Sequence, residues 1–167
     1  MDAMNLNAII AQEDRLVFSR FDEAAAFEIG TAIRDIALAE GHSIVCDIRL
    51  WDRPLFYMAL PGTTADNPDW VRRKANVVRR FSKSTYRMVL ERGAGEGNRA
   101  FPGDSGLSPQ DYVLAGGGFP VRIEGVGVVG AIIVSGAPED VDHMLVVRGI
   151  CGHLGIDADS LRLVAAE

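Results

Sequence analysis

Apolar residues recur at helical spacing in the first third of the chain. Between Asp22 and Gly41 they stand three and four positions apart, which predicts an amphipathic helix. Asp22 is a suitable N-cap residue and Gly41 a suitable C-terminal stop. Two strand-like runs follow, residues 43–48 and 55–60, and the short polar connection between them contains Pro54. We therefore predict a helix followed by an antiparallel hairpin.

The second half of the chain alternates between helical and strand-like patterns. Residues 69–81 have helical periodicity, and the periodicity resumes at residues 84–92. Residues 93–110 contain five Gly and two Pro residues, which predicts a long Gly/Pro-rich loop instead of a regular element. Two further strands and a final helix are predicted at residues 119–123, at residues 128–134 and from Pro138 onward.

The order of these elements predicts the fold class. Hairpin pairs separated by helices, without strict alternation of strand and helix, favour an α+β fold with a mainly antiparallel sheet flanked by helices. The length of 167 residues fits one domain, residues 1–167, around one core. Within it we treat residues 1–20 as an N-terminal extension, in which residues 16–18 are a candidate edge strand.

Composition and charge narrow the classes of function. The chain has 17 basic and 23 acidic residues, and its net charge of −6 argues against general binding to nucleic acid or to an anionic membrane. No apolar run approaches the roughly 20 residues of a membrane span, and the first residues are acidic where a signal peptide is basic. Cys46 and Cys151 lie far apart in apolar surroundings, which predicts buried free thiols. We therefore expect a cytoplasmic protein.

Familiar catalytic and metal-binding motifs are incomplete in this sequence. Residues 125–130 spell GxGxxG, but these glycines run into a strand instead of opening a helix, which favours a hairpin turn. His143 and His153 lack the spacing of a helical metal pair, and no Cys/His cluster lies near them. Ser135 lacks the glycine spacing of a nucleophile elbow, although amides of its turn suit an anion. We predict no catalytic residue and no metal ligand.

One stretch of the chain is strongly basic. Seven Lys and Arg residues and no acid lie at positions 72–87, so the rest of the chain carries −13 once these seven charges are removed from −6. On a continuous helix six of the seven share an arc of roughly 120°. Such a face either pairs with acids or binds carboxylates or phosphates. The seventh, Lys74, projects among Val71, Val78 and Phe81, where an ammonium must snorkel, pair or face a cavity.

Several segments together give a resemblance to a known family. They are residues 116–121, residues 130–138, residues 140–144 and the Lys74-Ala75 pair. These segments resemble the haem-degrading-domain family, which includes the HbpS-like and GlcG-like proteins, and the Lys-Ala pair matches that family's central helix. Residues 67–74 together with Asp142-His143 are similar to an uncharacterised cytosolic branch of the family. The resemblance covers roughly residues 20–155.

The resemblance implies a profilin-like domain with a five-stranded antiparallel sheet that assembles into dimers or larger homo-oligomers. It also implies haem as a ligand of some relatives, whereas haem degradation is a disputed label. Two departures weaken the expectation of haem coordination in this chain. Haem-binding relatives use a ligand near their N-terminus, but the first histidine here is His42, and Ala115 stands where the cytosolic branch often has histidine.

Two hypotheses about function follow. The first is a ligand-binding module, in which a pocket between the central helix and the sheet holds a small anionic ligand or a tetrapyrrole, with haem as the candidate cofactor. The second is an assembly or adaptor protein whose basic face meets an acidic surface on a second copy or on a partner. An enzyme ranks below both. The candidate ligand-binding residues are Trp70, Arg73, Lys74, Gly116, Gly117, Gly118, Phe119, Pro120, Ser135, Asp142 and His143.

Overall fold

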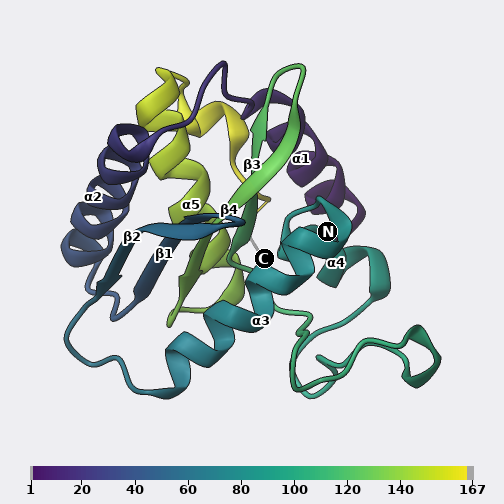
Figure 1. Ribbon diagram of the computed structural model, residues 1–167. Helices are drawn as coiled ribbons and strands as arrows, with labels where there is room; N and C mark the ends of the chain where they lie inside the picture. The colour runs from purple at the N-terminus through teal and green to yellow at the C-terminus, as the bar shows by residue number, and fades with distance from the viewer. Residues whose placement is uncertain (1, 165–167) are drawn as a thin grey trace.

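A four-stranded antiparallel sheet organises the chain in a computed structural model that describes residues 2–164 (Figure 1). The strand order is β2-β1-β4-β3. The elements are α1 (Asp2–Arg15), α2 (Glu23–Glu40), β1 (Val45–Leu50), β2 (Arg53–Ala59), α3 (Asp66–Phe81), α4 (Thr85–Arg92), β3 (Gly118–Ile123), β4 (Gly127–Ser135) and α5 (Glu139–Leu154). Short 3-10 turns lie at Gly103–Ser105 and Ala158–Leu161.

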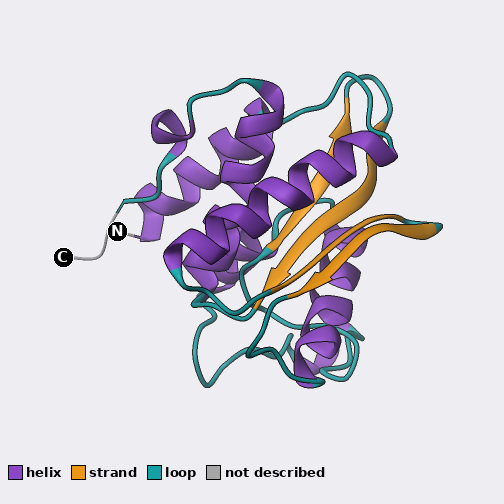
Figure 2. Ribbon diagram, turned by 90° about the vertical axis from the view of Figure 1, so that its left-hand side faces the viewer, coloured by secondary structure: helices purple, strands orange, loops and turns teal. Residues whose placement is uncertain are grey.

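Helices cover both faces of the sheet (Figure 2). The larger core lies under α2 and α5, where Ile33 and Val146 pack with Cys46 and other buried strand residues. The opposite face is covered by α3 through the small side chains Ala75 and Val78. Because β1 and β4 are the central strands, they are buried on both faces and carry the continuous apolar runs seen in the sequence.

The predicted α+β arrangement with an antiparallel sheet is confirmed. Asp22 caps α2 by accepting a hydrogen bond from the Ala25 backbone N–H, and Gly41 ends the helix in the left-handed conformation with φ 74°. Strands β1 and β2 form the predicted hairpin, and β3 and β4 pair across the glycine turn that spells GxGxxG. The interpretation of that motif as a hairpin turn is therefore right.

Two expectations about regular elements need correction. The resemblance implied five strands, whereas residues 2–164 contain four. The candidate edge strand at residues 16–18 is reduced to one parallel bridge between Phe18 and Ile123, because the chain leaves α1 and crosses the edge of β3 at a single residue. The two helical stretches predicted at residues 69–81 and 84–92 are confirmed as α3 and α4, and α3 ends where Ser82 adopts a left-handed φ of 53°.

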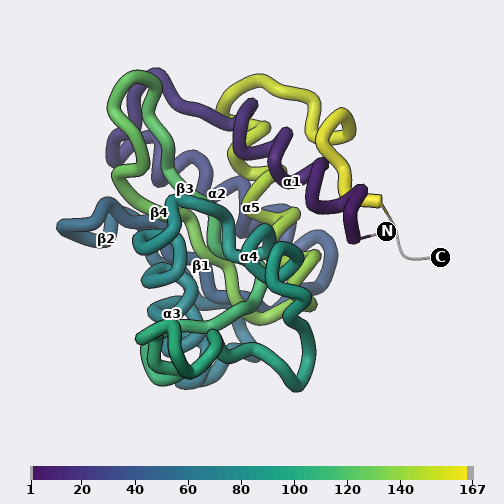
Figure 3. The backbone as a smooth tube through the Cα atoms, turned by 90° about the vertical axis from the view of Figure 1, so that its right-hand side faces the viewer, coloured from purple at the N-terminus to yellow at the C-terminus, as the bar shows by residue number. Residues whose placement is uncertain are grey.

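The N-terminal extension is a helix fastened by buried polar bonds. Gln12 is fully buried on α1 and donates to the Leu161 carbonyl at 2.7 Å. Glu13 accepts hydrogen bonds from the Ser84 backbone N–H and from Arg87, both at 2.7 Å. Figure 3 shows α1 running beside the C-terminal segment. These bonds tie α1 to the C-terminal segment on one side and to the start of α4 on the other.

Candidate functional site

A cleft of about 670 Å³ opens where α3, the loop after α4 and the turn between β4 and α5 meet. Its polar lining residues are Asn67, Trp70, Lys74, Tyr86, Glu96, Arg99, Ser135, Glu139, Asp140 and Asp142. The remaining lining comes from small or turn residues, among them Gly116 and Gly136. Five segments distant in sequence therefore contribute to one polar cavity.

Lys74 lies at the inner wall of this cleft and is only 3% exposed. Its helix, α3, packs on the sheet through Val71, Ala75 and Val78, and the same face carries Lys74 inward. The Lys74 ammonium donates to the Val134 carbonyl at 2.8 Å and to Asp142 Oδ2 at 3.2 Å. An ammonium has three N–H donors, so one donor remains beyond these two bonds. Lys74 is therefore paired with Asp142 and also lines the cavity.

Asp142 joins this lysine to the turn that begins α5. Its Oδ1 accepts a hydrogen bond from the Ala137 N–H at 2.9 Å, and its Oδ2 accepts one from the Gly136 N–H at 3.3 Å. Burial raises the pKa of Asp142, although Lys74 and the two amides oppose the shift. Burial likewise lowers the pKa of Lys74 against the attraction of Asp142. The pair binds α3, β4 and α5 together at the base of the cleft.

A second ion pair borders the cleft on the side of the long loop. Arg99 donates to Glu139 Oε2 at 3.0 Å and to the Leu114 carbonyl at 3.1 Å, both through Nη1. Glu139 Oε2 also accepts a hydrogen bond from the Gly116 N–H at 3.1 Å. Arg99 Nε and Nη2 make no hydrogen bond to the part of the chain that the structure describes. Arg99 therefore keeps a face of its guanidinium available to a ligand.

Three side chains add chemistry to the walls. Ser135 is 4% exposed, and its hydroxyl makes no hydrogen bond among residues 2–164. Tyr86 contributes a ring and a phenol, and burial raises the pKa of that phenol to about 12, so it stays protonated at neutral pH. Trp70 presents its indole to the cleft, while Arg73 stacks on that ring at 4.4 Å. The walls therefore combine hydroxyl groups with aromatic surface.

Close packing accounts for the triple glycine. A Cβ at Gly116 would lie 2.5 Å from the Glu139 carbonyl oxygen, and one at Gly118 would lie 2.8 Å from Thr85. At Gly117, which has a φ of 120°, a Cβ would collide with the Val134 carbonyl and lie 2.7 Å from Lys74 Nζ. Protein atoms therefore fill the space beside these glycines, including the space that the Lys74 ammonium needs.

The structure brings five of the eleven predicted site residues into the cleft: Trp70, Lys74, Gly116, Ser135 and Asp142. Arg73 stacks outside on Trp70 and pairs with Asp69 at 3.0 Å. Gly117, Gly118, Phe119 and Pro120 are buried where β3 begins, and Phe119 belongs to the main core. These five residues support the cleft from behind without lining it.

His143 is fully buried and also lies outside the cleft lining. Its Nε2 contacts Gln12 Oε1 at 2.7 Å. Because that oxygen can only accept, Nε2 is the donor and Nδ1 is the unprotonated nitrogen. Nδ1 has no hydrogen-bond partner among the described residues. Burial lowers the pKa of His143 to about 3, so this imidazole is neutral and holds α1 to α5.

Sequence reasoning missed several residues of the cleft: Asn67, Tyr86, Glu96, Arg99, Glu139 and Asp140. Glu96 and Arg99 lie in the Gly/Pro-rich loop, which has no periodicity to orient a side chain. Phe101 anchors this loop by stacking on Phe81 at 5.5 Å between ring centroids. The one usable signal was the pair of acids Glu139 and Asp140 at the start of the final helix, but acids at that position are also favoured by the helix dipole.

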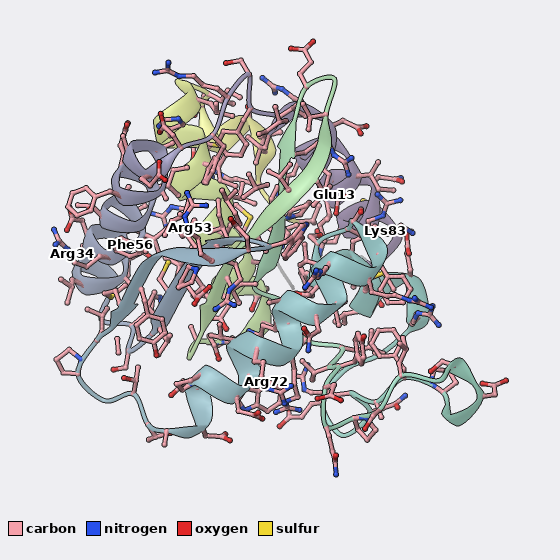
Figure 4. All side chains as sticks on the ribbon, in the orientation of Figure 1. Glu13, Arg34, Arg53, Phe56, Arg72 and Lys83 are labelled. Carbon is pink, nitrogen blue, oxygen red and sulfur yellow. The ribbon has the colours of Figure 1, made fainter. Side chains whose placement is uncertain are left out.

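The basic stretch is largely paired within the chain. Arg72 contacts Asp69 and Asp111, and Lys83 contacts Glu91. Figure 4 shows Arg72 along α3 and Lys83 at the far end of that helix, past the break at Ser82. The shared arc of six cations required a continuous helix, and that condition is not met, because α3 and α4 divide these residues. Internal pairing is the alternative that these contacts favour.

Two structural features are absent from residues 2–164. No group of three or more His, Cys, Asp or Glu side chains in that range is arranged to hold a metal ion. None of the helices there combines the length and apolar character needed to cross a membrane. Cys46 and Cys151 are both buried and unpaired with one another, as their apolar surroundings predicted.

The fold and the cleft define an α+β protein in which helices flank an antiparallel sheet and an ion-paired cleft lies at one end of the sheet. Residues 21–151 match the model of the family described as "Haem degrading protein HbpS-like". The chain belongs to this family, which confirms the resemblance found in the sequence. It is 58% identical over 163 residues to a UPF0303 protein of Mesorhizobium japonicum, covering 98% of this chain and 96% of that protein.

Solved structures agree with the fold. The crystal structure of Ybr137w protein aligns with a TM-score of 0.82 at 22% identity and covers 92% of each chain. A structure of PduOC in complex with haem aligns with a TM-score of 0.64 at 16% identity, covering 83% of this chain and 97% of the other. At these identities the similarity shows a shared fold and nothing about this chain's ligand.

Proposed function

We propose that this protein is a ligand-binding module whose cleft holds a small anionic ligand or a tetrapyrrole. The observation that carries the proposal is a nearly fully buried ammonium, Lys74, at the wall of a cavity that also contains a partly free guanidinium, Arg99. Burying charged groups costs free energy unless they are paired. A cavity that retains unused cationic donors is therefore suited to a ligand that brings acceptors.

Haem needs a separate test of fit. Among the described residues that line the cleft there is no His, Cys or Met, and the buried His143 uses Nε2 to bind Gln12. Tyr86 is the lining residue of a type that ligates haem iron in some proteins. The cleft therefore does not fit haem held by imidazole, thiolate or thioether. It fits a tetrapyrrole only through the ligand's own carboxylate groups, to which Arg99 and Lys74 can donate hydrogen bonds.

Titration with haemin and a panel of organic acids tests the proposal, followed by the Soret band and by thermal shift. We expect a saturable response to at least one compound and about tenfold weaker binding to Arg99→Met, because a charge-assisted hydrogen bond contributes about 1.5–3 kcal/mol. Arg34→Met is the matched control, since Arg34 is exposed on α2 and its one ion pair within residues 2–164 is with its neighbour Asp35. Absence of any response, or equal loss in both variants, would overturn the proposal.

We also propose that the chain forms a homo-oligomer through the outer edge of β2. Leu60 N–H donates to the Ile44 carbonyl, and in an antiparallel pair every second residue of β2 then hydrogen-bonds to β1. The residues between them, Tyr57 and Ala59, therefore point their backbone N–H and C=O groups away from β1. Tyr57 is 52% exposed. Figure 4 shows Phe56 of β2 beside α2, where it meets Phe27, which is 66% exposed. An unpaired edge beside exposed aromatic rings suits a second copy of the same strand.

Size-exclusion chromatography at low and high salt tests this interface. We expect the wild type to be a dimer or larger at both salt concentrations. Ala59→Pro removes one outward N–H without removing a bond to β1, so we expect this variant to shift toward monomer. Unchanged circular dichroism shows that the variant is folded. A wild-type monomer at both salt concentrations would contradict the proposal, and dissociation of the wild type by salt alone would favour assembly through the basic stretch.

A further inference from the structure

The charges that line the cleft do not balance. Lys74 and Arg99 are the two cations, whereas Glu96, Glu139, Asp140 and Asp142 are four carboxylates, so the lining carries −2. Asp142 is paired with Lys74 at 3.2 Å and Glu139 with Arg99 at 3.0 Å. The excess therefore resides on Glu96 and Asp140, neither of which forms an ion pair within residues 2–164.

Unused hydrogen-bonding groups of both kinds face this space. On the donor side are the remaining N–H of Lys74, which is 3% exposed, and the free Nε and Nη2 of Arg99. The Ser135 hydroxyl, on a residue 4% exposed, has no partner in the described chain and can donate or accept. On the acceptor side are the carboxylates of Glu96 and Asp140 and the second oxygen of Glu139. A buried lysine and a buried serine therefore both retain hydrogen-bonding groups that a ligand can use, in addition to the carboxylates.

We propose that the ligand of this cleft is a small zwitterion that carries one carboxylate and one ammonium group, as an amino acid does. Its carboxylate binds Arg99 and the free donor of Lys74, and its ammonium binds Glu96 and Asp140. The rings of Trp70 and Tyr86 contact its apolar part. This inference rests on the proposed ligand-binding function, and it names a ligand that carries an ammonium group in addition to the anionic group.

A ligand with only one of the two charged groups does not match all the hydrogen-bonding groups of the cleft. A ligand with only a carboxylate makes no use of the acceptors of Glu96 and Asp140 and adds a third negative charge to a lining of −2. A ligand with only an ammonium leaves the spare donors of Arg99 and Lys74 unmatched, and unmatched donors in a partly desolvated site cost free energy. A zwitterion meets both groups and leaves the net charge of the site unchanged.

Three compounds with one aromatic skeleton separate these alternatives: phenylalanine, 3-phenylpropionate and 2-phenylethylamine. Isothermal titration calorimetry at low ionic strength measures the dissociation constant of each for the full chain. We expect phenylalanine to bind at least about tenfold more tightly than either single-charge analogue, because each lacks one set of charge-assisted hydrogen bonds.

The double variant Glu96→Gln/Asp140→Asn locates the ammonium. We expect it to weaken phenylalanine and 2-phenylethylamine by about threefold or more, since both carboxylates are exposed, and to leave 3-phenylpropionate as tight as in the wild type or tighter. Asp104→Asn is the control, because Asp104 is an exposed acid in the turn Gly103–Ser105 and does not line the cleft. An equal effect of the control variant would overturn the inference.

The outcomes separate this inference from the proposed function. If 3-phenylpropionate binds as tightly as phenylalanine, or if haemin or a simple organic acid binds while phenylalanine does not, the zwitterion inference fails and the ligand-binding proposal stands. If none of these compounds binds, both fail. Preferential binding of phenylalanine that the double variant weakens, and that Asp104→Asn does not weaken, supports both.

Discussion

At the scale of single residues, the Lys74–Asp142 pair is the feature on which the site depends. The two charged groups are 3% and 2% exposed, and together they bond to a carbonyl of β4 and to two amides of the turn before α5. Desolvation opposes both charges, so the pair adds little net stability compared with an apolar pair. Its consequence is geometric, because it fixes the position of an ammonium at the wall of the cleft.

Removing one partner of this pair should be costly. Lys74→Met leaves Asp142 buried with a charge that only two backbone amides compensate, and we expect the free energy of unfolding to fall by about 3–5 kcal/mol. Adding Asp142→Asn, which removes the buried charge and keeps an oxygen acceptor for one of the two amides, should recover part of that loss. Urea unfolding measures both variants. Arg34→Met in an exposed pair is the control and should change stability by about 0.5 kcal/mol or less. A similarly small change in Lys74→Met would show that the pair is not coupled to the fold.

His143 should make stability depend on pH below neutrality. Burial lowers its pKa in the folded protein to about 3, below the 6.5 of a free imidazole, so between these values the unfolded chain binds the extra proton. This contribution is complete above pH 6.5 and is lost as the pH falls toward 3, by up to about 1.4 kcal/mol per pH unit. We expect His143→Asn to lose less stability than the wild type between pH 6.5 and 4 in urea unfolding. His42→Asn controls for loss of an imidazole elsewhere, and parallel curves for wild type and His143→Asn would refute the assignment.

At the scale of elements, local sequence signals predicted most of the fold. Asp22 and Gly41 marked the ends of α2 because their side chain and backbone satisfy the helix termini. The periodicity indicated an interruption between residues 81 and 84, but not its cause, because serine carries no preference for the left-handed conformation that Ser82 adopts there. The candidate strand at residues 16–18 shortened to one bridge at Phe18, since pairing depends on where α1 packs and not on the apolar run itself.

The entry of β3 should tolerate no side chain at Gly117. Gly117→Ala combines a φ of 120° with a Cβ that collides with the Val134 carbonyl and lies 2.7 Å from the Lys74 ammonium. We expect a loss of about 3 kcal/mol in the free energy of unfolding. Gly97→Ala has a φ of 83° but open space around it, so it should cost only the backbone strain of about 1–2 kcal/mol. Thermal unfolding of the two variants compares them, and an equal loss would show that packing against Lys74 is not what requires the glycine.

At the scale of the whole molecule, the site is a product of tertiary structure. Lys74 was found from sequence because a cation on an apolar helix face conflicts with the local pattern, and Asp142 was found through the family resemblance. Arg99, Glu96 and Tyr86 reach the same cavity from a loop and a helix whose positions no local pattern sets. His143 was predicted to be a site residue because it follows Asp142 in the sequence. Successive helical residues point to different faces, however, and the His143 imidazole is buried in the core.

The central claim is that the cleft beside Lys74 is a ligand-binding site. NMR spectra of the amide groups, recorded while titrating the compound that binds most tightly in the calorimetric and spectroscopic panels, test it most directly. We expect saturable shifts at the amides of Gly116, Gly136 and Ala137 and at the Trp70 indole N–H, with Val126 in the β3–β4 turn unchanged. Shifts centred away from these residues, or no shift with any compound, would contradict it.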